Sequence, residues 1–271
     1  MTAAAAFAEL HRAGCFVMPN PWDRGSARAL EQMGFPALAT TSAGFAWSIG
    51  EPDNGAGLDR VLAHLRDIVS AVRVPVNADF EGGYAVEPEA VAANVRSAAA
   101  TGIAGLSIED STGDAAAPLF DFAHSVERIR AARRAINASG TGVVLTGRSE
   151  GFICGRPDLA ETIRRLTAYA EAGADCLYAP GVRARDDVAA IVRAVAPKPV
   201  NLLLYSDFLT VAEAAELGVR RISIGGALAR TAWAGFLEAA RELAGDGTVT
   251  RLSKGAPAAE LNRLFQRPSQ R

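Results

Sequence analysis

The chain has 271 residues, of which 49% are hydrophobic and 21% charged, so it can bury a large core and does not have the composition of a disordered protein. Its formal net charge of -2 excludes the basic surface of a nucleic-acid-binding protein. The three cysteines are widely spaced and form no CxxC pair, which argues against structural zinc and disulfides and favours a cytoplasmic location. Neither a signal peptide nor a run of roughly 18 apolar residues occurs, so no membrane association is expected.

Short β-branched or apolar runs alternate along the chain with Ala-rich segments of helical character. The runs predict eight strands, at 15–18, 37–40, 74–78, 105–108, 143–146, 176–178, 200–203 and 221–224. Helices are predicted between them at 27–33, 58–72, 88–100, 158–172, 185–195 and 211–217, and several end at a glycine suited to a left-handed C-cap. Eight strand–helix units predict an α/β fold of the (β/α)8 TIM-barrel type, because doubly wound open sheets usually stop near six strands.

No Pro/Ser-rich linker interrupts this series, so residues 1–245 are predicted to form a single barrel domain. Residues 246–271 are predicted to be a C-terminal helical tail, with one helix at 257–266 and a frayed end at 268–271. The Gly- and Ala-rich segment 113–119 predicts a mobile loop after the fourth strand.

Acidic side chains gather after the carboxyl ends of predicted strands, where barrel enzymes build their active sites. Asp79 and Glu81 follow the third strand directly before Gly82-Gly83, Glu109 follows the fourth, and Asp53 lies beyond the second. Four acids that meet at one end of a barrel repel one another, and a divalent cation relieves that repulsion. Because the ligands are all oxygens, Mg²⁺ is predicted, with Mn²⁺ as a second possibility, in preference to zinc.

Other residues at the same end suit an anionic substrate. Arg148 ends the fifth strand and can donate a two-pronged hydrogen bond to a substrate carboxylate. The backbone N–H groups at the second strand's mouth can meet a second anionic oxygen. The predicted substrate-binding residues are therefore Ser42, Ala43, Gly44, Phe45, Arg148 and Asn201.

Each of these residues also has a structural interpretation. Asp53 can form an Asx turn beside Pro52, and the other acids can be helix N-caps or surface groups. Cys154 is expected to be a small packed hydrophobe, with a reactive thiolate as the alternative. The three histidines, at positions 11, 64 and 124, fall in helical stretches and are predicted to be solvated.

The motifs around these residues resemble those of the isocitrate lyase/phosphoenolpyruvate mutase superfamily, over roughly residues 15–235. The resemblance rests on Pro19-Asn20-Pro21-Trp22-Asp23, Thr41-Ser42-Ala43-Gly44, Asn77-Ala78-Asp79-Phe80-Glu81-Gly82-Gly83-Tyr84, Ile108-Glu109-Asp110 and Gly147-Arg148-Ser149-Glu150. It implies a barrel whose last helix is exchanged between subunits, a homo-oligomer (a dimer, or a homotetramer built as a dimer of dimers), and a magnesium-bound 2-oxo or hydroxy acid. It also implies that Ser42 and Gly44 grip the substrate, that Asp53, Asp79 and Glu109 serve the metal, and that Arg148 binds a carboxylate.

Two departures from the family pattern bear on the reaction. Asn77 stands where many members have an aspartate that ligates the metal, and Glu81 is a candidate to compensate for the lost charge. The loop 110–119 carries no Cys, Lys or His, whereas the isocitrate and methylisocitrate lyases have Lys-Lys-Cys-Gly-His there. The mutases have Lys and Asn in that loop and a His after the sixth strand, where this chain has Tyr178-Ala179-Pro180-Gly181.

The sequence therefore predicts a magnesium-dependent lyase that cleaves a C–C bond of a small 2-oxo carboxylic acid through an enolate. The reaction would be like that of oxaloacetate decarboxylase or methylisocitrate lyase, with Arg148, Glu109 and Tyr178 as the catalytic residues and Tyr178 or water as the proton donor. One alternative is a phosphonate C–P bond mutase or hydrolase. The other is a barrel that binds a 2-oxo acid without turning it over.

Overall fold

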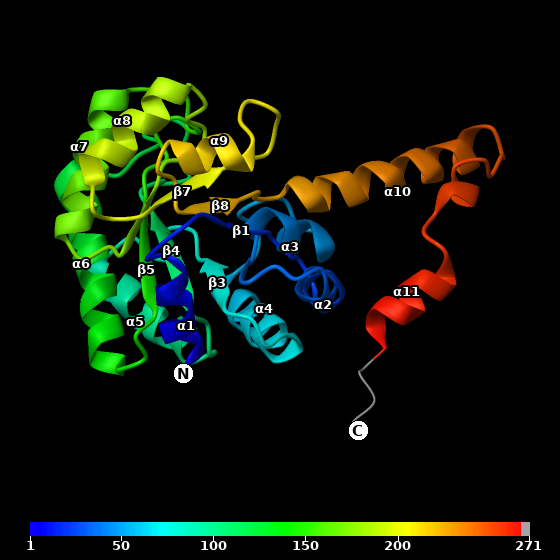
Figure 1. Cartoon of the computed structure of the whole chain (residues 1–271), viewed down its shortest axis with the longest axis horizontal. Coiled ribbons are helices and arrows are strands. Elements are labelled where there is room, and N and C mark those ends of the chain that lie inside the picture. The colour runs from blue at the N-terminus through cyan, green and yellow to red at the C-terminus, as the bar shows by residue number, and fades with distance from the viewer. Residues whose placement is uncertain (267–271) are drawn as a thin grey trace.

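The computed structural model of the chain describes residues 1–266. Eight parallel strands form one nearly closed barrel, in the order β1-β8-β7-β6-β5-β4-β3-β2 (Figure 1). Where β1 and β2 meet, the Ala39 amide donates a hydrogen bond of 3.0 Å to the Pro19 carbonyl. The strands are β1 Phe16–Met18, β2 Leu38–Ala39, β3 Val76–Asp79, β4 Gly105–Glu109, β5 Val144–Arg148, β6 Cys176–Tyr178, β7 Val200–Leu203 and β8 Arg221–Ser223. The predicted barrel class and all eight strand positions are confirmed.

Helices surround the barrel. The predicted ones appear as α2 Arg24–Gln32, α4 Leu58–Ala71, α5 Pro88–Ala99, α7 Leu159–Glu171, α8 Arg185–Val195 and α9 Val211–Glu216. Three helices were not predicted, α1 Ala3–Leu10, α3 Ser42–Ser48 and α6 Phe122–Ser139, and α10 Ala227–Gly245 is the last helix that the family resemblance implied. In α6 the reason is physical: its inner face includes the buried cation Arg128, which interrupts the apolar stripe that marks an amphipathic helix.

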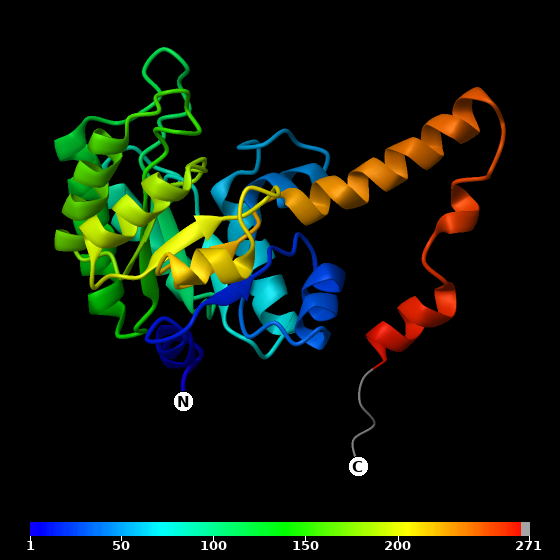
Figure 2. The ribbon, with the colours of Figure 1, turned by 45° about the horizontal axis from the view of Figure 1, so that its top comes forward.

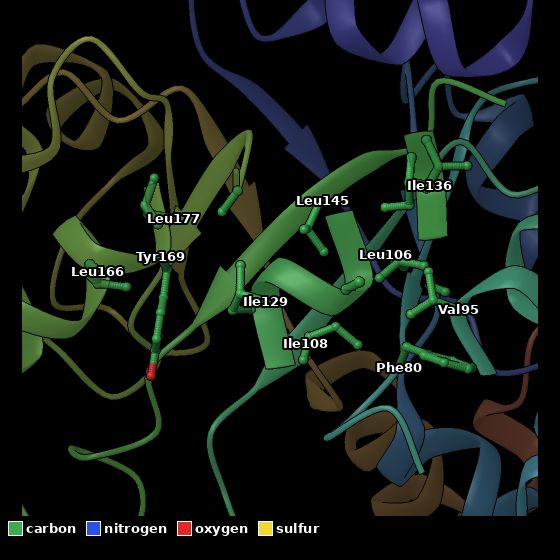
Figure 3. Close-up of a cluster of buried hydrophobic side chains, with 14 of the residues drawn as sticks. Phe80, Val95, Leu106, Ile108, Ile129, Ile136, Leu145, Leu166, Tyr169 and Leu177 are labelled. Atoms are coloured by element: carbon green, nitrogen blue, oxygen red, sulfur yellow. The ribbon is translucent and has the colours of Figure 1, made fainter. Parts of the chain in front are cut away.

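The main apolar core lies between the strands and the outer helices. Leu106 and Ile108 of β4 and Leu145 of β5 pack with Val95 of α5 and Ile129 of α6 (Figure 3). Because side chains alternate along a strand, the residues between these apolar ones face the inside of the barrel. Toward the carboxyl ends of β4 and β5 those residues are polar, and they build the site described below.

The amino-terminal helix α1 covers the end of the barrel where the strands begin. Phe7 is fully buried there and packs with Phe16, Met18 and Val144 in a second apolar cluster. This helix leaves the opposite end of the barrel, at the carboxyl ends of the strands, open to a ligand.

The last helices extend away from the barrel. In α10 only Ala229 is buried, and the helix projects outward before the chain turns through η1 Leu252–Lys254 (Figure 2). Helix α11, Ala258–Phe265, returns toward α2, where Arg28 donates a 3.0 Å hydrogen bond to the Phe265 carbonyl. This is the helix predicted in the tail. The frayed end predicted at 268–271 lies outside the described residues.

The division at residue 245 and the exchange of α10 between subunits remain predictions. Among the helices in residues 1–266, none combines the length and apolar character that crossing a membrane requires.

Candidate active site

A pocket of about 370 Å³ opens at the carboxyl ends of the strands. Most of the predicted site residues line it, some from the inward-facing positions of strands and others from the segments that follow the strands: Ser42, Ala43, Asp53, Asp79, Glu81, Glu109, Arg148, Tyr178 and Asn201. Gly44 and Phe45 lie outside this lining. The ring of Phe45 stacks on His64, with 3.9 Å between the ring centroids. The expectation that His64 is solvated is wrong, since the residue is only 8% exposed.

Arg148 lies at the centre of the pocket's charged groups. Its Nη1 contacts a carboxylate oxygen of Asp79 and one of Glu109, each at 3.1 Å. Its Nε and Nη2 both donate to Glu150, the latter at 3.1 Å. The Tyr178 ring centroid lies 5.4 Å from the guanidinium carbon. One buried cation is thus shared by three acids.

Burial disfavours the charged forms of the acids in this pocket. It raises the pKa of Glu109 well above its usual range, although Arg148 opposes the shift. Burial and the nearby charge of Asp79 raise the pKa of Glu81 to about 7. The same two causes raise the pKa of Asp53. The pocket mouth therefore holds more negative charge than Arg148 alone neutralises.

A buried network holds Glu150 in place against Arg148. The Glu150 amide donates a 2.7 Å hydrogen bond to Asp110, whose other carboxylate oxygen accepts from Arg165 at 3.1 Å and Tyr169 at 2.7 Å. Asp110 and Glu150 therefore fix the orientation of the arginine.

A tight turn directs Glu81 into the pocket. Glu81, Gly83 and Tyr84 all have positive φ angles, of 45°, 76° and 55°, which is strained backbone for the two non-glycine residues. The Tyr84 hydroxyl donates a 2.9 Å hydrogen bond to Glu81. Arg128 of α6 supports the turn by donating to the carbonyls of Gly82, Ala85 and Val86. This anchor could not be recognised from the sequence, because α6 was not predicted.

The backbone amides predicted to meet a substrate anion are largely engaged within the protein. Ser42 donates to Asp79 from its amide at 3.0 Å and from its hydroxyl at 2.9 Å. The Gly44 amide donates to the Thr41 hydroxyl, which caps α3, and the Phe45 amide donates to the Thr41 carbonyl. Ser42 and Ala43 still line the pocket. Their contact with the substrate stays a prediction, and it would involve their side chains or the edge of the pocket.

The pocket floor contains an arginine that the sequence analysis missed. Arg221 begins β8, is 2% exposed, and donates from Nε to the Asn201 side-chain oxygen at 2.8 Å. The two-residue period that places Arg221 and Ser223 on one face of β8 was a signal that could have found it. Asn77 also lines the pocket, is 4% exposed, and has a side-chain oxygen without a hydrogen-bond partner among residues 1–266.

The residues fit a hard divalent cation by chemistry and charge. Asp53, Asp79, Glu81 and Glu109 are oxygen donors that line one pocket, and the pKa shifts described above express excess negative charge. Within the described residues, however, no three of these side chains are already arranged around one point as metal ligands. Arg148 lies between Asp79 and Glu109, so those acids would have to turn from it to hold an ion.

Comparison with known proteins places the chain in a family. The family described as phosphoenolpyruvate phosphomutase matches residues 7–244. The chain belongs to the isocitrate lyase/phosphoenolpyruvate mutase superfamily. Members include lyases, hydrolases and mutases that act on small oxo acids. The resemblance inferred from the motifs is therefore confirmed.

Several members are similar over nearly their whole length. A structure from Burkholderia cenocepacia J2315, described provisionally as a lyase/mutase, is 48% identical, covers 98% of this chain and 97% of its own, and has a TM-score of 0.94. The structure of 2,3-dimethylmalate lyase is 30% identical, with coverage of 97% and 94% and a TM-score of 0.86. An oxaloacetate decarboxylase from a Bradyrhizobium species is 27% identical over 94% of this chain and 89% of its own.

One further structure of this superfamily includes a metal. A phosphonopyruvate hydrolase, 26% identical with a TM-score of 0.85, covers 97% of this chain and 95% of its own and is a complex with oxalate and Mg²⁺. A divalent cation and a small dicarboxylate therefore bind to at least one protein of this fold.

Proposed function

We propose that the protein is a divalent-metal-dependent lyase that cleaves a C–C bond of a small 2-oxo carboxylic acid, with decarboxylation of oxaloacetate as the leading reaction. The observation that carries the proposal is the pairing of Arg148 with Asp79 and Glu109 at the mouth of one small pocket that Asp53 and Glu81 also line, beside the phenol of Tyr178. The similarity to oxaloacetate decarboxylase and 2,3-dimethylmalate lyase supports C–C cleavage.

The acids and the arginine have different roles in binding the substrate. Asp53, Asp79, Glu81 and Glu109 would hold Mg²⁺ or Mn²⁺, which when bound supplies a Lewis acid for the negative charge that develops on the substrate's keto oxygen. Arg148, released by Asp79 and Glu109, donates its Nη1 hydrogens to a substrate carboxylate while Glu150 keeps the guanidinium in line.

Decarboxylation then needs little further chemistry from the protein. The bond between C3 and the departing carboxylate breaks, its electron pair forms the enolate, and CO2 leaves. The Tyr178 hydroxyl donates a proton to C3 to give pyruvate, and the phenol regains a proton from solvent. No general base is required to start this sequence, which suits a loop 110–119 without Cys, Lys or His.

The direct test follows pyruvate formation from oxaloacetate with added Mg²⁺, with Mn²⁺, and after chelation. Asp79→Asn should abolish most metal-dependent turnover, by about a hundredfold or more, because it removes one negative charge from the proposed metal site and one of the two oxygens that hold Ser42 and Arg148. Asp114→Asn, in the exposed loop, is the matched control, and a reaction with metal but no protein corrects for metal-catalysed decarboxylation in solution. Absence of both turnover and competitive oxalate binding in the wild-type protein would refute the proposal.

Two alternative functions can be tested with the same purified protein. Phosphonate chemistry is favoured by the phosphoenolpyruvate phosphomutase match, and phosphonopyruvate assayed in parallel would release phosphate or form phosphoenolpyruvate if it holds. A non-catalytic 2-oxo acid binder would show a thermal shift with oxalate or 2-oxoglutarate and form no product.

A further inference from the structure

Arg221 is a buried cation without an acidic partner. It is 2% exposed, and it forms no salt bridge among the described residues. Its three hydrogen-bonded neighbours are neutral: Asn201 at 2.8 Å, Thr146 at 3.0 Å and His11 at 3.3 Å. Burying an unpaired charge is costly, and an apolar side chain of similar volume would fill the space without that cost. The arginine therefore calls for a reason beyond packing.

The position of Arg221 in the sheet links it to the active site. In the strand register, Arg148 lies beside Tyr178, Tyr178 beside Asn201, and Asn201 beside Arg221. The row begins one strand earlier with Glu109, which is paired with Arg148. The predicted proton donor Tyr178 thus stands between the charged mouth and the buried arginine.

The donors and acceptors in this row allow one direction of hydrogen bonding. An arginine can only donate, so the Asn201 amide must turn its oxygen to Arg221 and its nitrogen to the Ser223 hydroxyl, 2.9 Å away. That amide nitrogen can only donate, so the Ser223 oxygen accepts and its own hydrogen is free for another acceptor. Ser223 and Tyr178 both line the pocket, and the Ser223 side chain opposes the burial that raises the pKa of Tyr178 to about 12. If the phenol oxygen accepts the free Ser223 hydrogen, the phenol's own proton is left for the pocket.

We propose that Arg221 is a positioning residue that, through Asn201 and Ser223, orients the Tyr178 hydroxyl so that its proton faces the substrate carbon. The role rests on the proposed function, in which Tyr178 protonates the enolate. Arg221 touches no reacting atom, and its effect on the reaction passes entirely through the two side chains between them.

Helix α1 holds the far end of this relay. The Phe7 carbonyl accepts a 2.8 Å hydrogen bond from His11 Nδ1, so His11 Nε2 is left to accept from Arg221. Burial and the charge of Arg221 lower the pKa of His11 to about 3, so the imidazole stays neutral at working pH. Every group from α1 to Ser223 therefore keeps one protonation state, as a positioning device requires.

The first experiment is a double-mutant cycle between Ser223→Ala and Tyr178→Phe. Ser223→Ala removes only a hydroxyl, and it should lower kcat by about fivefold in the wild-type background, the effect of one lost hydrogen bond. In the Tyr178→Phe background the same change should have no further effect, because its target is gone. Equal losses in both backgrounds would overturn the relay. Arg221→Gln should behave as Ser223→Ala does, with Arg220→Gln, one residue earlier, as the matched control.

The second experiment does not depend on turnover. The protein has four tyrosines, so labelling with 3-fluorotyrosine gives a small set of ¹⁹F resonances, and Tyr178→Phe identifies the one of interest. Ser223→Ala should raise the pKa of this phenol, because the phenolate loses a donor. Arg221→Gln should raise it as well, and adding Arg221→Gln to Ser223→Ala should cause no further shift. An unchanged phenol pKa in Ser223→Ala refutes the relay, whereas a shifted pKa in a protein without lyase activity refutes only the proposed reaction.

Discussion

Arg148 and Arg221, two arginines that face the barrel interior, have opposite surroundings. Arg148, at the mouth, is shared by the carboxylates of Asp79, Glu109 and Glu150, whereas Arg221, at the floor, has only neutral hydrogen-bond partners. In the proposed function, Asp79 and Glu109 turn from Arg148 to a metal ion and a substrate carboxylate takes their place, while Glu150 stays on the guanidinium. The hydrogen-bond partners of Arg221 are neutral and have fixed donor and acceptor roles, so a metal ion or a substrate carboxylate has no acid to displace there. The first environment suits binding and chemistry, and the second suits orientation.

The largest expected effect comes from Arg148. Arg148→Met should lower kcat/KM for the 2-oxo acid by about a hundredfold or more, because it removes the cation that binds the substrate carboxylate. Arg164→Met, at an exposed position on α7, should leave kcat/KM unchanged. Steady-state kinetics of the two variants measure the difference. If Arg148→Met costs no more activity than Arg221→Met, the distinction between the mouth and the floor is wrong.

The stabilities of the same two variants should differ in their pH dependence. Burial already raises the pKa values of Glu109 and Glu150 while Arg148 opposes the shift, so Arg148→Met raises them further. A carboxyl group whose folded pKa is raised contributes stability at low pH and loses it as pH rises through that pKa. Arg148→Met should therefore lose stability relative to wild type as pH rises from about 5 to 8, by on the order of 2 kcal/mol.

Arg221→Met removes a cation that forms no salt bridge among the described residues. The loss in unfolding free energy of this variant relative to wild type should therefore be the same at every pH from about 7 to 9. Below that range His11, whose pKa is held at about 3 partly by Arg221, should accept a proton more readily in the variant. Urea denaturation at four or five pH values measures both curves. Parallel curves for the two variants would contradict the different surroundings of the two arginines.

The contrast between the two arginines also shows what a sequence reveals. The eight strands could be predicted because short apolar runs recur with helices between them, and the acids could be predicted because they follow strand ends directly. Arg148 ends a strand and was visible for the same reason. Arg221 begins one, and its contact with Asn201 arises from the stagger of neighbouring strands, which no local pattern encodes.

Other misses have related causes. Arg128 supports the turn at Glu81 from a helix whose inner face is partly charged, so neither the helix nor the contact could be predicted. The amides of Ser42 to Phe45 were predicted to meet a ligand because the sequence does not show that α3 begins there and engages them. His64 fell in a helix as predicted, but its burial depends on Phe45, which is distant in sequence.

The smallest expected effect concerns the pocket's thiol. Cys154 lines the pocket, and its sulfur lies 4.0 Å from the Ser111 hydroxyl. Ser111 belongs to the loop 110–119, where the isocitrate and methylisocitrate lyases have a cysteine. Burial and the charge of Glu150 raise the pKa of Cys154, so the thiol stays protonated at neutral pH and is a poor nucleophile. Cys154→Ala should therefore change kcat by less than about twofold, whereas Tyr178→Phe should lower it by about a hundredfold. The reverse ranking would assign protonation of the enolate to the thiol, and the row from Arg221 to Tyr178 would then support the barrel without directing a proton.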